Sequence, residues 1–591
     1  MEDNINIKKV KKKKVSTDKE QNKKLTSIAF NILAVFCIAI FCIAIFCFAI
    51  TPKSFQNDTF YTIAVGQGIR EYGIDGQDHF SMHDLPYTYP HWLYDVIMSL
   101  IYDFLGGFTG LYISTVILSI ILGLLLYFTL KKITKNQLVS FAIALGQMYI
   151  MKDYVAARAQ LVTFILFVLT ILFIEKFLES GKKRYALGLI IIPILIANLH
   201  SAVFPFYFVL YLPYIGEYLV KLLIDAHLPH RIYSKYLDIS IKRANKKLKK
   251  VSKDVASSYQ KKIIDLNKKV EEEQVRFEAA KAKMVEKRKR PYKLEIEKLD
   301  RVKWLIIIMI ICIFTGLLTP IKDMPYTYTL KIMQGNTTSS ISEHLPLTLI
   351  QSKSTLFCLT LTIALLIFTN VKIKLRDLFF LGGLTFLALT SRRQVSMLIL
   401  FGGIVLAKIL VNLINKYDKR GTEQVIDFMT TAVGEVLTIL FAFSISYYVY
   451  SPSIGAPYII ESSYPVEASK WIKENLDYKN IKLFNDYNYG SYLLFEDIPV
   501  FIDSRCDLYT PEFNGEKGDD GKYDGQDIFS DYMNISGIGT YYETKFEEYD
   551  ITHVMTKTNS KLNMLISRDD NYKELYKDDN FIIYERENAN G

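Results

Sequence analysis

The chain has 591 residues, of which 50% are hydrophobic and 22% are charged, and its formal net charge is +10. This composition excludes an ordinary soluble enzyme and a chain that is disordered over most of its length. Basic residues gather at the N-terminus, in short loops and in one long insertion, whereas the chain after residue 450 is acidic. This asymmetry is typical of membrane topology and of contact with anionic membrane lipids. No nucleic acid is expected as a partner, because the lysine runs have no interleaved aromatic residues.

Apolar runs recur along the chain, and about 20 apolar residues suffice to cross a hydrocarbon core of about 30 Å. We therefore predict a polytopic α-helical membrane protein with about eleven transmembrane helices, at residues 26–50, 108–130, 137–151, 160–178, 185–199, 202–223, 304–320, 354–371, 376–390, 395–414 and 430–450. The basic tail at 1–25 should stay in the cytoplasm, since positively charged flanks favour that side. The N-terminal transmembrane module then covers 26–230 and the C-terminal module covers 304–450. The amphipathic segment 92–105 is expected to lie along the external interface.

The insertion at 231–303 is dense in Lys and Glu and has apolar residues at helical spacing. It is predicted to form one long cytoplasmic helix or a helical hairpin of coiled-coil character, with Pro291 ending or kinking the pattern. Both a solvated charged helix without chemistry and a docking arm for a cytoplasmic protein fit this composition.

The last part of the chain, 451–591, is predicted to form a small extracytoplasmic α/β domain. A helix signal lies at 466–472, and short strand-like runs lie at 481–484, 499–502, 552–555 and 581–584. The Gly-, Asp- and Lys-rich stretch at 514–526 is expected to be a surface loop.

The first external loop, residues 51–91, is rich in acids, histidines and tyrosines, and its glycines at 66 and 68 are expected to form turns. Asp58 lies near its start, just outside the first predicted span. Group transfer to a hydroxyl needs a base near that hydroxyl, and a lipid-linked donor presents its headgroup at the membrane surface. Asp58 is therefore the predicted catalytic base. Asn-Asp-Thr is also an N-cap signature, so capping of the helix that follows is the alternative role.

Three arginines lie at the external ends of predicted spans, on the side where Asp58 is expected: Arg158, Arg392 and Arg393. They fit either a shared anion-binding role or snorkelling toward the membrane surface. Arg392 and Arg393 are adjacent and differ in facing, so at most one of them should point inward. His200 lies in a tight external turn and Glu343 in a further external loop.

A divalent cation such as Mg, Mn or Zn, held by Asp58, an external histidine and Glu343, is conceivable from the ligand types. The sequence has no HExxH or DxD spacing. No residue is therefore assigned as a metal ligand, and a divalent cation, Mg or Mn, is the one cofactor that stays conceivable.

Several short runs outside the insertion form a set: Asn57-Asp58-Thr59-Phe60-Tyr61, Asp78-His79-Phe80-Ser81, His91-Trp92-Leu93, Arg158-Ala159-Gln160, Asn198-Leu199-His200, Ile341-Ser342-Glu343-His344, Ser391-Arg392-Arg393-Gln394, Asn485-Asp486-Tyr487-Asn488-Tyr489-Gly490 and Asp503-Ser504-Arg505-Cys506-Asp507. Together they resemble the GT-C class of polytopic glycosyltransferases, which includes dolichyl-phosphate-mannose mannosyltransferase-like and oligosaccharyltransferase-like proteins. The resemblance is greatest to the poorly characterised bacterial branch of that class.

The resemblance implies that Asp58 is catalytic, that the donor is a polyprenyl-phosphate sugar, and that hexosyl or pentosyl transfer inverts the anomeric centre. It also implies that the other runs bind substrate, through Asp78, His79, His91, Arg158, Gln160, His200, Glu343, Arg392, Arg393, Asp503 and Arg505. Phe60-Tyr61-Thr62, Arg158-Ala159-Gln160 and Glu343-His344 depart from the pattern of the class, in which aromatic-aromatic-His, Arg-Pro-Gln and Glu-Trp are expected.

The sequence is thus interpreted as a multi-pass glycosyltransferase of the cell membrane. Its acceptor would be an extracytoplasmic cell-envelope glycan, glycolipid or protein. Arg158 and Arg392 or Arg393, with His200, would stabilise the departing phosphate, while the loops at 485–490 and 503–507 would cover the site or bind the acceptor. A flippase or other transporter of a lipid-linked glycan, which predicts charged residues deep within spans, is one alternative. A membrane scaffold, which should fail when 231–300 is deleted, is the other.

Overall fold

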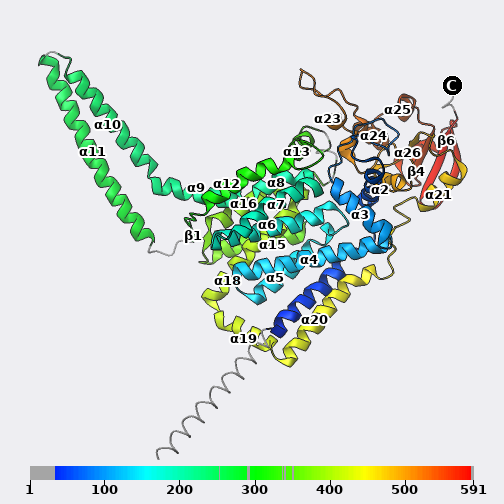
Figure 1. The fold of residues 1–591 in the computed structure, drawn as a ribbon, viewed down its shortest axis with the longest axis horizontal. Helices are drawn as coiled ribbons and strands as arrows, with labels where there is room; N and C mark the ends of the chain where they lie inside the picture. The colour runs from blue at the N-terminus through cyan, green and yellow to red at the C-terminus, as the bar shows by residue number, and fades with distance from the viewer. Residues whose placement is uncertain are drawn as a thin grey trace, which may run out of the picture.

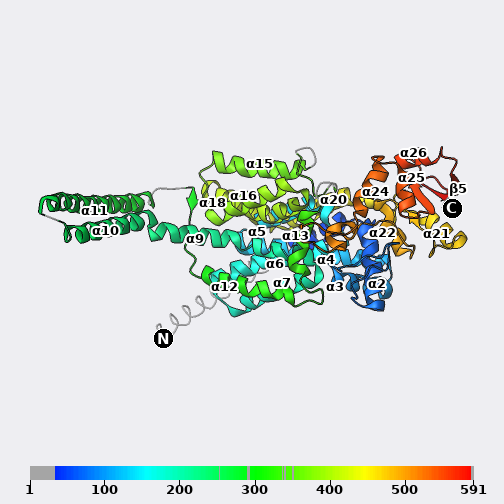
Figure 2. The same cartoon turned by 90° about the horizontal axis from the view of Figure 1, so that it is seen from above.

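A computed structural model describes residues 33–251, 253–288, 293–335, 337, 341, 343–348 and 352–587. The predicted basic tail at 1–25, the first part of the first predicted span (26–32), Pro291 and Ser342 lie outside these described residues. A body of packed helices separates a projecting helical pair at one end from a mixed helical and β unit at the other end (Figure 1, Figure 2).

The first half of the chain is helical almost throughout. After the helix Leu33–Ile50 come α2 (Asn57–Tyr72), α3 (Trp92–Phe104), α4 (Phe108–Thr134), α5 (Gln137–Ile150), η1 (Lys152–Tyr154), α6 (Ala159–Ser180), α7 (Lys183–Leu199), η2 (Ser201–Val203), α8 (Phe204–Val209), α9 (Leu212–Ala226), α10 (Leu228–Leu248) and α11 (Lys253–Arg288). The body continues with α12 (Val302–Ile313), η3 (Phe314–Leu317), α13 (Met324–Gln334), α15 (Lys353–Phe368), α16 (Leu375–Thr390), η4 (Arg392–Gln394), α17 (Val395–Met397), η5 (Leu398–Gly402), α18 (Gly403–Tyr417), α19 (Lys419–Met429) and α20 (Ala432–Tyr450).

Among the described residues, six helices are long and apolar enough to cross a membrane: Leu33–Ile50, Phe108–Thr134, Ala159–Ser180, Ser201–Ala226, Arg392–Tyr417 and Ala432–Ser453. The other five predicted spans coincide with the shorter helices α5, α7, α12, α15 and α16. A helix rises 1.5 Å per residue, so the 16 residues of α15 or α16 reach about 24 Å, short of a 30 Å core. The total of about eleven spans therefore stays a prediction.

The span Arg392–Tyr417 contains one π-helical turn, η5. A π turn disturbs the regular backbone hydrogen bonds of a helix and leaves carbonyl groups free for other donors. The side-chain amide of Gln147 uses them, because its Nε2 donates to the carbonyls of Ile399 and Leu400 at 3.0 and 2.7 Å. This contact fixes α5 against the interior of the helical body.

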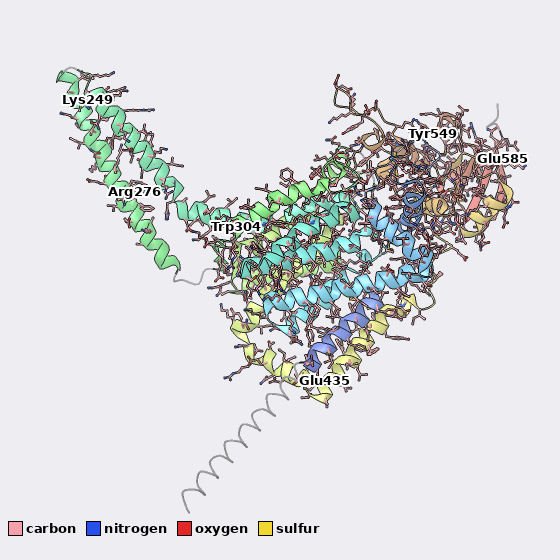
Figure 3. All side chains as sticks on the ribbon, viewed as in Figure 1. Lys249, Arg276, Trp304, Glu435, Tyr549 and Glu585 are labelled. Carbon is pink, nitrogen blue, oxygen red and sulfur yellow. The ribbon has the colours of Figure 1, made fainter. Side chains whose placement is uncertain are left out.

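The predicted insertion forms the hairpin rather than one long helix. Helices α10 and α11 lie side by side and project away from the body (Figure 1, Figure 2), and Lys249 lies at the tip with Arg276 along α11 (Figure 3). The ring of His230 stacks on Phe277 with centroids 4.0 Å apart, which links the two helices near their base. The chain then returns to the body through β1 (Leu294–Glu295), which pairs in parallel with β2 (Ile373–Lys374). The cytoplasmic placement of this hairpin remains a prediction.

The chain after α20 forms a four-stranded sheet with short helices around it. Its elements are η6 (Ser451–Ser453), α21 (Val466–Asn475), β3 (Leu483–Phe484), α22 (Tyr487–Phe495), η7 (Cys506–Tyr509), α23 (Pro511–Asn514), α24 (Ile528–Gly537), α25 (Tyr542–Glu548), β4 (His553–Lys557), α26 (Lys561–Ile566), β5 (Tyr572–Lys577) and β6 (Phe581–Arg586). The strand order is β3-β4-β6-β5, with β3 and β4 parallel and the other pairs antiparallel.

The prediction of a strand at 499–502 is wrong, and β5 was not predicted. Val500 makes only an isolated bridge with Ser81, since this apolar run is buried against the first loop and not within the sheet. β5 lies at the edge of the sheet, where only Tyr572 is buried and the other residues are exposed or partly buried, so it has no apolar run.

The predicted first external loop, residues 51–91, contains a buried helix, α2, which packs on α3 and on α22 of the C-terminal unit. The ring of Phe60 contacts those of Tyr464 and Tyr492, with centroids 4.9 and 5.1 Å away, so α2 and the C-terminal unit share one core. Gly66 does not form a turn. A Cβ there would lie 2.0 Å from the carbonyl oxygen of Asp95, so glycine lets α2 approach α3 closely.

Candidate active site

A cavity of about 360 Å³ lies where the start of α2 meets the start of α6, the loop before α3 and the C-terminal unit. Its lining includes eight of the twelve residues predicted to form the site, namely Asp58, His91, Arg158, Gln160, His200, Glu343, Arg393 and Arg505. We call it the Asp58 cavity. The fold thus brings together residues from both predicted transmembrane modules and from the C-terminal unit.

Asp58 and Arg158 form an ion pair on the wall of this cavity. The Arg158 Nε lies 3.0 Å from Asp58 Oδ2, and its Nη1 lies 3.6 Å from Glu343 Oε1. These three residues form what we call the Arg158 cluster, in which one guanidinium is shared between two carboxylates. The alternative role of Asp58 as an N-cap is wrong, because the N-cap of α2 is Gln56 and Asp58 lies inside the first turn.

Arg158 itself is the N-cap residue of α6, with an extended backbone. This places its side chain at the end of a predicted span rather than within it. Its Nε is buried but makes no aligned hydrogen bond within the described part of the chain. The guanidinium therefore keeps donor capacity that an anionic ligand can use.

A second cavity, of about 710 Å³, shares Arg158, Gln160, Glu343 and Arg393 with the first. Its other charged lining residues are Lys152, Asp153, Lys353 and Arg392, and we call it the Arg392 cavity. Both adjacent arginines therefore face this cavity, which differs from the expectation that at most one points inward. The short η4 turn, in which the backbone N–H groups of Arg392 and Arg393 donate to the carbonyls of Leu345 and Glu343, allows this arrangement.

His91 and His200 form one wall of the Asp58 cavity, with ring centroids 5.0 Å apart. Burial lowers the pKa of His91 to about 4 and lowers the pKa of His200 well below its ordinary value. Both rings are therefore neutral at pH 7. The Nδ1 of His200 lies 2.8 Å from the hydroxyl of Thr163, which orients the ring.

Three other predicted residues form a closed cluster beside the cavity. The Nη1 of Arg505 donates to Asp78 Oδ1 at 2.6 Å, and its Nη2 and Nε donate to Asp503 at 2.7 and 3.0 Å. The Tyr509 hydroxyl donates to Asp503 Oδ2 at 2.6 Å. In this Arg505 cluster, Asp78 and Asp503 are buried and do not line the cavity, although Arg505 reaches its wall.

His79 lies apart from the site. Its Nε2 is 2.6 Å from Asp75 Oδ2, its ring stacks on Tyr72, and it lines neither cavity. The substrate-binding roles of the predicted residues stay predictions, but Asp78, His79 and Asp503 line neither cavity, whereas Asp58 and Arg158 both line the Asp58 cavity.

The other lining residues include Tyr328, Tyr487 and Asp507, none of which was singled out from the sequence, although Tyr487 and Asp507 lie within the loops predicted to cover the site or bind the acceptor. The hydroxyl of Tyr328 donates to Asp507 Oδ2 at 2.7 Å, and burial raises the pKa of the Asp507 carboxyl. Tyr487 and Asp507 belong to runs that carried the family resemblance, so those runs were the available signal. Tyr328 lies in α13, outside those runs, and had no sequence signal.

The carboxylates do not fit the conceived divalent cation. Arg158 already lies between Asp58 and Glu343, so a cation placed there would meet a fixed positive charge. Among the residues that the structure describes, no group of three or more His, Cys, Asp or Glu side chains is arranged to hold a metal ion.

No protein-family model matches this sequence. No curated protein matches it either. Solved structures of archaeal oligosaccharyltransferase from Archaeoglobus fulgidus resemble the chain. The complex of that enzyme, AglB, with an inhibitory peptide and a dolichol-phosphate has a TM-score of 0.48 and 10% identity, covering 94% of this chain and 74% of that chain. The structure of that enzyme tethered with an acceptor peptide has a TM-score of 0.48 and 11% identity, and the match covers 93% of this chain and 73% of that chain.

Proposed function

We propose that this chain is an integral membrane glycosyltransferase that moves a sugar from a polyprenyl-phosphate donor to a hydroxyl group of an extracytoplasmic acceptor. The observation that carries the proposal is the Arg158 cluster, a carboxylate and a shared guanidinium facing one accessible cavity. Supporting it, the cavity lies at one end of a body that holds six helices of membrane-spanning length among the described residues.

The donor enters with its phosphate toward the Arg392 cavity, whose lining has five cations and two carboxylates. Arg158 exchanges its contact with Asp58 for a contact with the donor phosphate. This exchange brings the guanidinium to the leaving group and frees the Asp58 carboxylate at the same time. Arg392 and Arg393 add positive charge on the same side, where negative charge grows as the phosphate departs.

Asp58 then acts as the general base. Its carboxylate accepts the proton of the acceptor hydroxyl, the acceptor oxygen forms a bond to the anomeric carbon, and the bond from that carbon to the phosphate oxygen breaks. The electron pair leaves with the polyprenyl phosphate, which Arg158 and its neighbouring arginines hold. Attack opposite the leaving group inverts the anomeric centre.

The neutral wall residues complete the site without adding charge. His91 and His200 offer ring nitrogens to sugar hydroxyls, because burial keeps both rings neutral at pH 7. Tyr487 and Asp507 approach from the C-terminal unit, so this unit supplies the wall that binds the acceptor.

A strain that lacks the protein, complemented with wild type or with Asp58→Asn, tests this function. We expect wild type to restore a missing surface glycan, while Asp58→Asn leaves the lipid-linked donor accumulated at equal protein level. The matched control is Asp84→Asn, an exposed carboxylate of the same loop that lines neither cavity. Full complementation by Asp58→Asn would show that Asp58 is not the base.

A further inference from the structure

A third cavity lies at the other end of the helical body, away from the Asp58 cavity. It has a volume of about 300 Å³ and is bordered by the ends of α4, α6, α16 and α18 and by the β1–β2 pair at the base of the hairpin. Figure 1 and Figure 2 show β1 near the base of the hairpin and α18 at the same end of the helical body. The charged lining residues are Lys132, Lys135, Glu175, Lys176, Glu179, Glu295, Lys372, Lys374, Arg376, Asp377 and Lys408, and we call it the lysine cavity.

The floor of the lysine cavity is a closed set of ion pairs. Lys408 Nζ lies 2.6 Å from Asp377 Oδ1 and 3.8 Å from Glu175 Oε1. Arg376 is 6% exposed and lies 3.0 Å from Glu217, a buried residue that does not line the cavity. Each charge of the floor is therefore paired with an opposite charge, so the floor offers no free charge to a ligand.

The mouth of the lysine cavity has more cations than carboxylates. Lys132 pairs with Glu179 at 2.8 Å, and both Lys135 and Lys176 also lie close enough to interact with that single carboxylate. Neither Lys135 nor Lys176 has a carboxylate within ion-pair distance among the described residues. On the opposite side, Lys372 pairs with Glu295 at 2.7 Å. Three lysines around one carboxylate leave positive charge that no residue of the mouth neutralises.

The position of the lysine cavity indicates which ligands can reach it. It opens where α4, α6 and α18 end, and these belong to helices long enough to cross a membrane. Trp304, 54% exposed, lies at the same end of the body (Figure 3), as interfacial tryptophans do. Anionic headgroups and soluble phosphates are both available at such a surface, and lysine binds phosphate groups as a point charge.

We propose that the lysine cavity is a second binding site, for a phosphate-bearing anion, separate from the Asp58 cavity. The anion sits between Lys135 and Lys176 on one side and Lys372 on the other, above the floor of paired charges. Its source is either the headgroup of an anionic phospholipid or a soluble phosphate or diphosphate. The proposal does not depend on the transferase function, because no residue of this cavity belongs to the catalytic site.

The test uses the full chain in neutral detergent, with Lys135→Gln/Lys176→Gln as the variant. These two lysines were chosen because their removal strips no carboxylate of its ion-pair partner. Phosphatidylglycerol retention is measured by native mass spectrometry, and thermal stabilisation is measured with sodium phosphate and with pyrophosphate. The control is Lys182→Gln/Lys183→Gln, which removes two exposed lysines from the neighbouring loop outside the cavity.

We expect the cavity variant to bind the anion about 30-fold more weakly than wild type, because each lysine near a phosphate contributes about one kcal/mol. The affinity of the control variant should change by less than about 3-fold. Loss of phosphatidylglycerol alone identifies a lipid headgroup, and loss of phosphate or pyrophosphate stabilisation alone identifies a soluble anion. Lys135→Arg/Lys176→Arg keeps both positive charges and should therefore keep anion binding. This variant distinguishes a loss of charge from a loss of folded structure. Equal binding by wild type and cavity variant, or an equal loss in the control, would overturn the proposal.

Discussion

The Arg158 cluster and the Arg505 cluster both link the loop at residues 51–91 to distant parts of the chain, but they differ in how completely their charges are satisfied. Arg505 is 3% exposed and its two carboxylate partners are 0% exposed. Arg158 and Asp58 are 27% and 25% exposed, and Glu343 is 58% exposed. A closed cluster of this kind holds the fold, whereas an open one can exchange a protein partner for a ligand.

The largest effect should come from opening the closed cluster. Arg505→Met leaves Asp78 and Asp503 buried without their counter-charge, so the free energy of unfolding should fall by about 3–5 kcal/mol. Thermal or chemical unfolding in detergent measures this change. Arg70→Met is the control, because Arg70 pairs with Asp103 at the surface and should contribute less than about 1 kcal/mol. Equal losses in both variants would contradict the structural role of Arg505.

Removing the guanidinium of the open cluster should act on the reaction rather than on the fold. Arg158→Gln is expected to lower the rate of sugar transfer by about 10²–10³-fold, as loss of a group that stabilises developing negative charge does. The free energy of unfolding should change by less than about 1 kcal/mol, because the pair is partly exposed. Transfer assays and unfolding curves on the same preparation measure both. If the transfer rate of Arg158→Gln falls only in proportion to the amount of folded protein, Arg158 has a structural role like that of Arg505 and no role in the reaction.

The neutral histidines give a smaller, pH-dependent effect. Burial holds the pKa of His91 and of His83 at about 4, below the ordinary value of 6.5. As pH falls from 6.5 to 4, the unfolded chain binds protons that the folded chain does not, so stability should fall through this window. His91→Gln and His83→Gln should each flatten that fall in unfolding measurements.

The two histidines differ in position, so their variants separate an effect on stability from an effect on the reaction. His91 lines the Asp58 cavity, whereas His83 bonds to the carbonyl of Phe501 at 2.9 Å and lines neither cavity. His91→Gln should therefore also lower the rate of sugar transfer at pH 7, and His83→Gln should leave it nearly unchanged. A larger loss of transfer rate in His83→Gln than in His91→Gln would contradict the claim that the wall containing His91 contacts the substrate.

The smallest effect should come from the hairpin, which lies far from both clusters. Replacing residues 229–288 by a flexible linker should leave the transfer rate within about 3-fold of wild type. The replacement keeps Glu295 and Glu297, because these pair with Lys372, Lys374 and Arg376 at the base. Loss of transfer and of assembly together would favour the scaffold function.

The sequence located much of the Arg158 cluster because the positive-inside rule placed its members at one external rim. Asp58, Arg158 and Glu343 are separated widely along the chain, yet each follows or precedes an apolar run. The ends of spans on one side of a membrane share a plane, which brings such residues within reach of one another.

The N-cap signature at Asp58 indicated a helix there, but the sequence could not reveal that α2 is buried or how the two clusters differ. Residues from Thr59 to Gly66 are buried on every side, so α2 has no polar stripe to mark a helical period. The carboxylates of Asp78 and Asp503 look like those of Asp58 in a sequence, and only packing decides which are sealed. The edge strand β5 was missed because its residues are largely polar and exposed.

The most direct test of the account is the rate at which isolated membranes consume the lipid-linked donor that accumulates in the deficient strain. Asp58→Asn should slow this consumption by about 10²–10⁴-fold, the contribution of a positioned general base, while Asp84→Asn consumes donor at the wild-type rate. Donor consumption by Asp58→Asn within about 3-fold of wild type would contradict the claim that Asp58 carries the chemistry.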